Sequence, residues 1–88
     1  EEREAALVLS RAVRLGEKLI AEGERDATKV LDAMKAEIQA TPLARIDYVS
    51  AVNLDTLEAL DRLEGTVLVA MAVYIGRTRL IDNFIVEC

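Results

Sequence analysis

The strongest constraint on the fold is a segment near the end of the chain that has the pattern of a β-hairpin. Val67 to Glu87 consists of two apolar, β-rich runs separated by Gly76-Arg77. These two residues fit a type II′ turn, in which glycine takes the first central position because that position requires a positive φ. The turn predicts a register that starts with Ile75 opposite Thr78. One face then pairs Val73 with Leu80, Met71 with Asp82, Val69 with Phe84 and Val67 with Val86, and the other pairs Tyr74 with Arg79, Ala72 with Ile81, Ala70 with Asn83 and Leu68 with Ile85.

Both faces of this hairpin are apolar over much of their length, so we expect it to be covered on more than one side. Two helices on one face of a small sheet cover only that face. Either the sheet curls, or its second face meets something outside this chain. Gly65 ends a longer connection that can readjust, so we expect a side chain to be tolerated better there than at Gly76.

The first half of the chain predicts two helices. Between Glu4 and Glu22, apolar residues recur every three or four positions, which places them on one helix face. Gly23 is placed to end this helix and Asp26 to cap the next one, which Thr41-Pro42 ends. The short connection makes the helices antiparallel neighbours. The expected buried stripes are Ala5, Leu9, Ala12, Gly16, Leu19 and Ile20 in the first helix, with Gly16 allowing close approach, and Ala27, Val30, Leu31, Met34 and Ile38 in the second.

The middle of the chain predicts one further strand and a connector. Residues 45–52 alternate weakly, and we expect one side to carry Ile46, Tyr48 and Val52 and the other Asp47, Val49 and Ala51. Residues 53–65 carry leucine every third residue, a spacing that favours one or two helical or 3₁₀ turns lying on the core. Residues 1–88 therefore predict a single α+β domain, with two antiparallel helices packed on a small antiparallel sheet of about three strands that includes the C-terminal hairpin.

Composition excludes several classes of protein. The 16 acidic and 11 basic residues give a net charge of −5 and are spread along the chain, which disfavours binding to nucleic acid. No apolar run approaches the ~20 residues of a membrane span, and no signal-peptide pattern opens the chain, so we expect a cytoplasmic protein. The single cysteine, Cys88, excludes an intrachain disulfide, and we expect it to be a surface thiol. The chain opens in helical pattern without an initiator methionine, which indicates a longer parent protein.

No catalytic, cofactor-binding or metal-binding residue is predicted in this chain. It has no histidine, which excludes Ser-His-Asp and Cys-His sites and histidine-based metal sites. Its four glycines lie far apart, so neither a P-loop nor a dinucleotide fingerprint is present. Acidic pairs such as Asp47 with Asp55, or Asp61 with Glu64, are interpreted as solvated carboxylates.

Four polar residues of the hairpin, and Leu7 in the first helix, are the residues for which we consider a role beyond the core. The register places Asp82 on the face of Met71, where a carboxylate needs a hydrogen-bond donor. Three alternatives stay open for Asp82. Its carboxylate accepts hydrogen bonds from backbone groups or an arginine, a bulge turns it outward, or it positions a neighbouring loop or domain together with Asn83. Arg77 is expected to be solvated, and Arg79 to stack on Tyr74. Leu7 lies about half a turn from the first helix stripe, and we expect it to contact something outside this domain's core.

Several short motifs, taken in order, resemble the C-terminal domain of the pantoate-β-alanine ligase (pantothenate synthetase) family, and together they cover nearly the whole chain. The closing Gly76 to Asn83 run is the most specific piece. The matching pieces are Glu2-Arg3-Glu4-Ala5-Ala6, Leu9-Ser10-Arg11-Ala12, Gly23-Glu24-Arg25-Asp26, Ile46-Asp47-Tyr48-Val49, Asp55-Thr56-Leu57 and Gly76-Arg77-Thr78-Arg79-Leu80-Ile81-Asp82-Asn83.

The resemblance implies an ATP- and Mg²⁺-dependent ligase. In the family, ATP adenylates pantoate with release of pyrophosphate, and β-alanine then displaces AMP to give pantothenate. The nucleotide site belongs to a larger N-terminal domain with an HxGH-type motif, and the C-terminal domain is a lid that helps to exclude water. The resemblance implies that this chain is the lid, inactive alone, with the N-terminal domain as its partner. Two alternatives stay open: a small interaction module that shares this order of motifs, and a module that forms homodimers through an open sheet edge and its doubly apolar hairpin.

Overall fold

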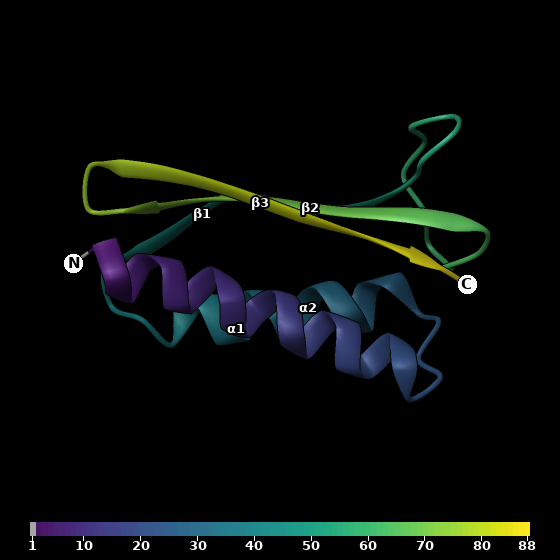
Figure 1. The fold of residues 1–88 in the computed structure, drawn as a ribbon, viewed down its shortest axis with the longest axis horizontal. Coiled ribbons are helices and arrows are strands. Elements are labelled where there is room, and N and C mark those ends of the chain that lie inside the picture. The colour runs from purple at the N-terminus through teal and green to yellow at the C-terminus, as the bar shows by residue number, and fades with distance from the viewer. Residues whose placement is uncertain (1) are drawn as a thin grey trace.

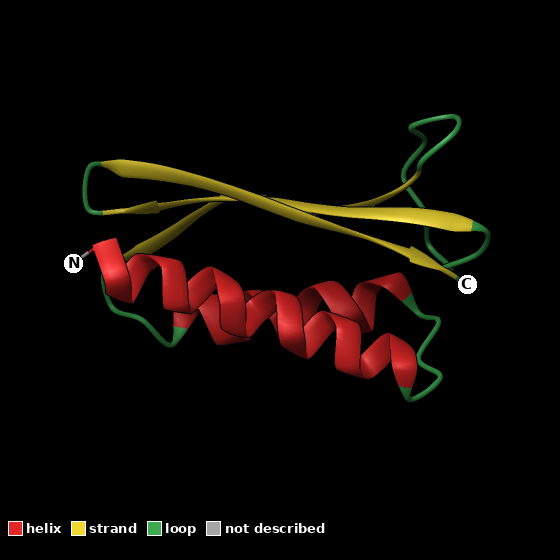
Figure 2. Cartoon of the chain, viewed as in Figure 1, coloured by secondary structure: helices red, strands yellow, loops and turns green. Residues whose placement is uncertain are grey.

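The computed structural model describes residues 2–88, with side chains from residue 7 onward, and it has two layers (Figures 1 and 2). Helices α1 (Glu2–Ala21) and α2 (Ala27–Gln39) form one layer. Strands β1 (Ala44–Asn53), β2 (Thr66–Ile75) and β3 (Thr78–Glu87) form the other, an antiparallel sheet in the order β1-β2-β3. Both helices lie on the same face of the sheet. The predicted α+β fold is confirmed.

The turn between the helices follows from two local signals in the sequence. Gly23 adopts a φ of +103° and, with Glu24, donates backbone hydrogen bonds to the carbonyls of Ile20 and Leu19. These bonds satisfy the last carbonyls of α1 in the Schellman arrangement. Asp26 then caps α2, because its side chain accepts a hydrogen bond from the backbone N–H of Lys29. Both predicted helix signals are confirmed.

The β2–β3 hairpin has the predicted register at every position. Ile75 lies opposite Thr78, and the pairing continues without a shift to Thr66 and Glu87. Gly76 has a φ of +60°, whereas Arg77 is not among the described residues with a positive φ. A type I′ turn would require positive φ at both positions, so the type II′ assignment holds.

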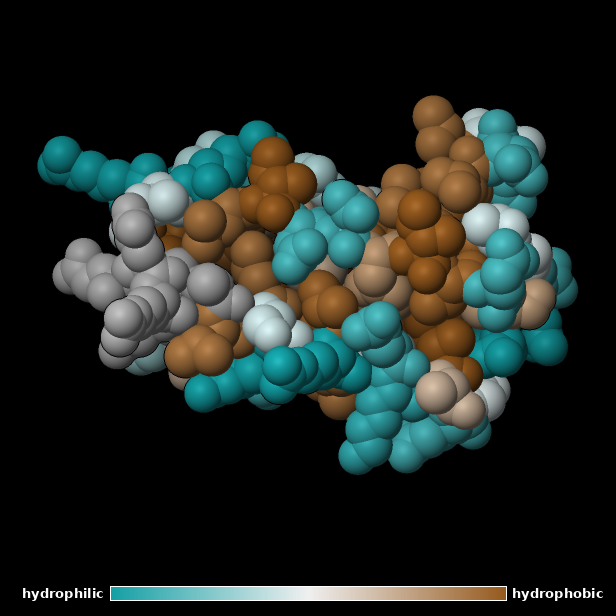
Figure 3. Space-filling model, viewed as in Figure 1, coloured by the Kyte–Doolittle hydropathy of each residue, from teal (hydrophilic) through white to brown (hydrophobic). Residues whose placement is uncertain are grey.

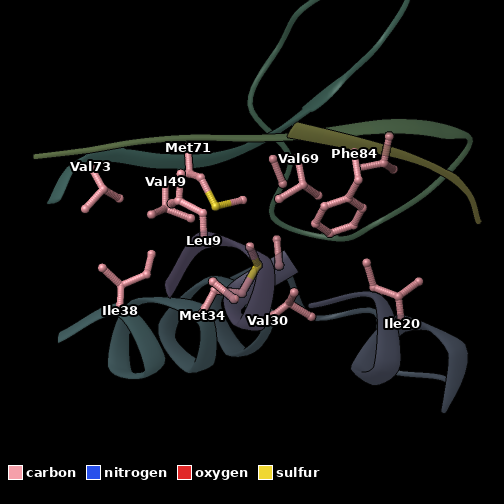
Figure 4. Close-up of a cluster of buried hydrophobic side chains, with 14 of the residues drawn as sticks. Leu9, Ile20, Val30, Met34, Ile38, Val49, Val69, Met71, Val73 and Phe84 are labelled. Carbon is pink, nitrogen blue, oxygen red and sulfur yellow. The ribbon is translucent and has the colours of Figure 1, made fainter. Parts of the chain in front are cut away.

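The core lies between the two layers (Figure 4). The inner face of β2 alternates with its other face and presents four fully buried residues, Val67, Val69, Met71 and Val73. These residues pack against the predicted stripes of the two helices. Leu19 and Leu31 are only partly buried, and Val8 is a buried residue that the stripes did not include. The side chain of Ala5 lies outside the described part. The helix residues of the core are Val8, Leu9, Ala12, Ile20, Ala27, Val30, Met34 and Ile38.

Gly16 sits where α1 comes closest to its neighbours. A Cβ atom at this position would lie 2.6 Å from Sδ of Met34 and 3.1 Å from Cζ of Phe84. The first distance is shorter than real Cβ contacts, so a larger residue would require the buried Met34 side chain, and the packing around it, to shift. The close approach expected from Gly16 in the stripe is confirmed.

The predicted alternation of the first strand was wrong around Asp47. The pairing of β1 with β2 shifts between Ile46 and Tyr48, so Asp47 is the extra residue of a β-bulge. Because of this extra residue, Ile46 and Val49 both pack toward the helices, and Tyr48 lies on the other side and is exposed. A strict two-residue period carried through the bulge put Ile46 and Tyr48 on one side.

The connector between β1 and β2 contains turns and isolated bridges, not the helical or 3₁₀ turns that its leucine spacing suggested. Its backbone pairs back on β1, with Val52 bridged to Ala59, and Leu57 takes a φ of +62°. The expectation that it lies on the core holds for Leu63, which is 1% exposed, whereas Leu57 is 67% exposed. The leucines therefore divide between core and solvent.

Candidate functional site

The acidic residues considered from the sequence do not assemble into a catalytic cluster. Glu64 pairs with Arg62 on the surface, and the backbone N–H of Asp55 donates to the Asn53 side chain within a turn. Asp47 pairs with Arg79 on the sheet. Within the described part of the chain, no three His, Cys, Asp or Glu side chains are grouped so that they could hold a metal ion.

The polar residues of the hairpin lie on different sides of the sheet and have different neighbours. Asp82 shares the helix-facing side of the sheet with Met71, is partly exposed, and accepts a hydrogen bond from the backbone N–H of Asn83 at 2.8 Å. Of the alternatives left open by the sequence, this is the backbone acceptor role, and the regular register excludes a bulge at Asp82. Asn83 lies on the opposite side and is exposed, as is Arg77 in the turn.

The predicted stacking of Arg79 on Tyr74 was wrong. Arg45 of β1 takes that place, with its guanidinium carbon 4.8 Å from the centre of the Tyr74 ring. Arg79 instead donates to Oδ2 of Asp47 from both Nε and Nη2, at 3.3 and 2.9 Å. This hydrogen-bonded carboxylate raises the pKa of Arg79 above its ordinary value, so the guanidinium stays charged. The bulge adds the Asp47 side chain beside Arg45, Tyr74 and Arg79, and Asp47 rather than Tyr74 then becomes the partner of Arg79.

The side of the sheet opposite the helices, which we call the open face, consists of four rows that cross the three strands. The first row, nearest the hairpin turn, is charged and aromatic. The second and fourth rows are apolar, and the third is small and polar. In the order β1, β2, β3 the rows are Arg45-Tyr74-Arg79, Tyr48-Ala72-Ile81, Ser50-Ala70-Asn83 and Val52-Leu68-Ile85.

Large apolar side chains are exposed on this open face. Ile81 is 58% exposed, Ile85 56% and Tyr48 39%. Figure 3 views the two layers from the side and shows apolar areas that are separated by polar groups. Among the described residues 2–88, neither helix lies on this side of the sheet, and only part of the loop between β1 and β2 rises on this side, at the end away from the β2–β3 turn (Figure 2). The described helices therefore cover the hairpin on one face only, and the expectation that something outside this chain covers its second face stays a prediction.

Further exposed residues lie outside the four rows of the open face. Leu7 on α1 is 51% exposed and Leu43, between α2 and β1, is 69% exposed. The exposure of Leu7 agrees with its exclusion from the core stripe, and its contact with an outside partner stays a prediction. Cys88 is an exposed free thiol, as expected.

A shallow open depression lies at the loop between the helices. Its lining residues are also the residues that build the loop: Arg25 donates to the carbonyls of Ile20 and Glu24 at 2.8 and 2.9 Å, and its own carbonyl accepts from the N–H of Leu63. The Glu24 carboxylate accepts from the N–H groups of Arg25 and Asp26. The run Gly23 to Asp26 therefore serves the helix turn and its seal against the connector.

Comparison with known proteins shows which family this chain belongs to. The family model for pantoate-beta-alanine ligase matches residues 1–85. The chain belongs to this family. The resemblance drawn from the ordered motifs is confirmed, and the chain corresponds to the C-terminal part of the ligase.

Relatives and solved structures agree with this assignment. The pantothenate synthetases of Moorella thermoacetica and Acetivibrio thermocellus are each 52% identical to this chain over 87 residues, which is 99% of the chain and 31% of each relative. A crystal structure of pantothenate synthetase from Thermus thermophilus matches with a TM-score of 0.83 and 29% identity, over 94% of this chain and 30% of that one. The chain thus spans less than a third of the length of the ligases it matches.

Sequence reasoning named Ile81, Ile85 and Tyr48 only as members of an apolar pattern and did not consider Arg45 at all. The exposed isoleucines could have been found, because the predicted register already put them on the face opposite Val69 and Phe84. Arg45 could have been found only with the register of β1, which the bulge at Asp47 sets.

None of the described helices is both long enough and apolar enough to cross a membrane.

Proposed function

We propose that this chain is the lid domain of an ATP-dependent, AMP-forming ligase that joins pantoate to β-alanine, and that it is inactive alone. The observation that carries this proposal is the coverage: nearly the whole chain matches pantothenate synthetases, but it accounts for only about 31% of their length. The proposed parent enzyme acts in the cytoplasm, and the other domain of the same protein is the partner of this chain.

The residues that the structure describes do not fit an ATP or Mg²⁺ site. A triphosphate needs clustered backbone donors or basic side chains around it. The arginines of the first open-face row are already engaged, Arg45 with Tyr74 and Arg79 with Asp47. No metal-holding group is found among the described residues. We therefore assign ATP and Mg²⁺ to the remaining part of the ligase and derive no catalytic step here.

A lid contributes to such a reaction by excluding water. An acyl-adenylate is readily hydrolysed, so closure of a second domain over the nucleotide site protects it until the amine attacks. A small rigid domain suits this role, and the buried β2 residues and the close α1 contact at Gly16 supply that rigidity. The surface that closes must be complementary to the other domain, which this chain does not contain.

The test joins this chain to the part of the ligase that it lacks. In the Moorella thermoacetica enzyme, the 87 matching residues are replaced by this chain, and pantothenate formation from pantoate, β-alanine and ATP is measured. We expect the chimera to be active and the 88-residue chain alone to be inactive. An inactive but folded chimera would contradict the proposal.

A binding measurement addresses the isolated chain directly. Calorimetry with ATP and Mg²⁺ should give no detectable heat of binding to the 88-residue chain, because its described side chains gather no phosphate-binding groups. The active chimera serves as the positive control. A micromolar dissociation constant for the isolated chain would mean that it contains a nucleotide site of its own.

A further inference from the structure

The open face of the sheet carries exposed apolar side chains that take no part in the core. Its second and fourth rows expose Tyr48, Ile81 and Ile85, while the residues that alternate with them in β3, Leu80 and Phe84, pack on the core. These two apolar rows are separated by the small, polar third row and are bordered by charged groups at one end. Exposed apolar side chains rimmed by polar residues are typical of an interaction site.

We propose that the open face is the surface on which the nucleotide-binding domain of the same ligase docks. This inference rests on the proposed function. It assigns the contact to three strands of known register, with Tyr48, Ile81 and Ile85 as the apolar centre and the pairs Arg45–Tyr74 and Arg79–Asp47 as its polar border.

The size of the open face favours a tethered domain over a second copy of the chain. Each strand has 10 residues, and strands of that length, three abreast at a spacing of ~4.8 Å, offer on the order of 400 Å². A stable interface between separate chains buries about 800 Å² on each partner. Contacts between domains of one chain bury about 600–1,500 Å² in total and are more polar than the interfaces of permanent complexes. The area of the open face and its mixture of charged, polar and apolar rows fit such a contact. A tether also supplies an effective concentration in the millimolar range, so a small interface suffices.

The position of the connection agrees with this occupant. The matched part is C-terminal, so the rest of the ligase joins at the start of α1. In Figure 1 that end of α1 lies at the same end of the molecule as the β2–β3 turn. The charged first row of the open face lies next to this turn, because Tyr74 and Arg79 pair one step from Ile75 and Thr78. A domain attached there is close to the polar border of the open face.

The experiment compares the accessibility of single thiols in the 88-residue chain and in the chimera described above. Cys88→Ser removes the natural exposed thiol. Ile81→Cys and Ile85→Cys then report on the open face, and Ala36→Cys, at an exposed position of α2 in the helix layer, is the matched control. Maleimide labelling rates are measured for each variant in both proteins.

We expect labelling of the Ile81→Cys and Ile85→Cys variants to slow by about tenfold or more in the chimera, as burial against a docked domain requires, and labelling of the Ala36→Cys variant to stay unchanged. Equal rates in both proteins, or slowing only at position 36, would overturn the proposed docking surface. Protection in the isolated chain that rises with protein concentration would also overturn it, since the occupant would then be a second copy. The activity of the chimera without substitutions separately decides the proposed function, so the two failures are distinguishable.

Discussion

The two faces of the same sheet differ in what they require of the chain. Along β2, Val67, Val69, Met71 and Val73 are completely buried under the helices, and the residues between them belong to the open face. Since the strand backbone is common to both, the difference lies in what covers the side chains. The covered face holds the domain together, whereas the exposed side chains of the open face take no part in the core. Substitutions at matched positions separate these two roles.

The largest effect should come from placing a charge on the covered face. Val69→Asp buries a carboxylate with no donor, and we expect a loss of more than about 4 kcal/mol, enough to unfold a domain of this size. The matched variant on the open face is Ile85→Asp, which should change the free energy of unfolding by less than about 1 kcal/mol. Urea denaturation measures both. Similar losses would mean that the open face also belongs to the folding core.

A smaller but still large effect is expected at the contact between the layers. Gly16→Val places methyl groups where a single Cβ is already 2.6 Å from Sδ of Met34. Overpacking of this kind costs about 1–3 kcal/mol or more, so we expect a Tm lower by at least several degrees for a small domain. Gly16→Ala with Met34→Ala should be more stable than expected from the two single variants, because Met34→Ala removes the clashing sulfur. Additive losses would place the strain elsewhere.

The hairpin turn fixes which residues belong to which face, and it should tolerate substitution poorly. Gly76→Val forces a β-branched residue to a φ of +60°, at a cost of about 1–3 kcal/mol. Gly65 was expected to be more tolerant, but its φ is +69° and its carbonyl accepts the backbone N–H of Cys88. We now expect Gly65→Val to lower Tm by a similar amount. Thermal unfolding followed by circular dichroism compares the two, and an unchanged Tm for Gly65→Val would show that the loop readjusts.

The smallest effect is expected at the polar border of the open face. Arg79 and Asp47 are an exposed pair, with 41% and 40% of their side chains accessible, and such pairs contribute little to stability. Arg79→Ala should therefore leave the Tm of the isolated chain unchanged while weakening activity of the chimera, because docking uses this border. Asp47→Ala should behave alike. A marked loss of Tm in the isolated chain would assign the pair to folding instead.

The local features of the fold could be read from the sequence because each depends on residues close together in the chain. The Gly76-Arg77 turn set the register of β2 and β3, and the spacing of apolar residues set the buried faces of both helices. Gly23 and Asp26 marked the turn between them for the same reason. The family could also be read, because its motifs occur in a fixed order.

What only the tertiary structure decided depends on contacts between distant segments. The bulge at Asp47 appears only when β1 is paired with β2. It places Ile46 on the helix-facing side, and it places Arg45 rather than Arg79 against the ring of Tyr74. Likewise, the sequence showed that both faces of the hairpin are apolar, but only the placement of both helices on one face identified the other as open. A local pattern records which side chains are apolar, and three-dimensional packing determines which of them the chain itself can cover.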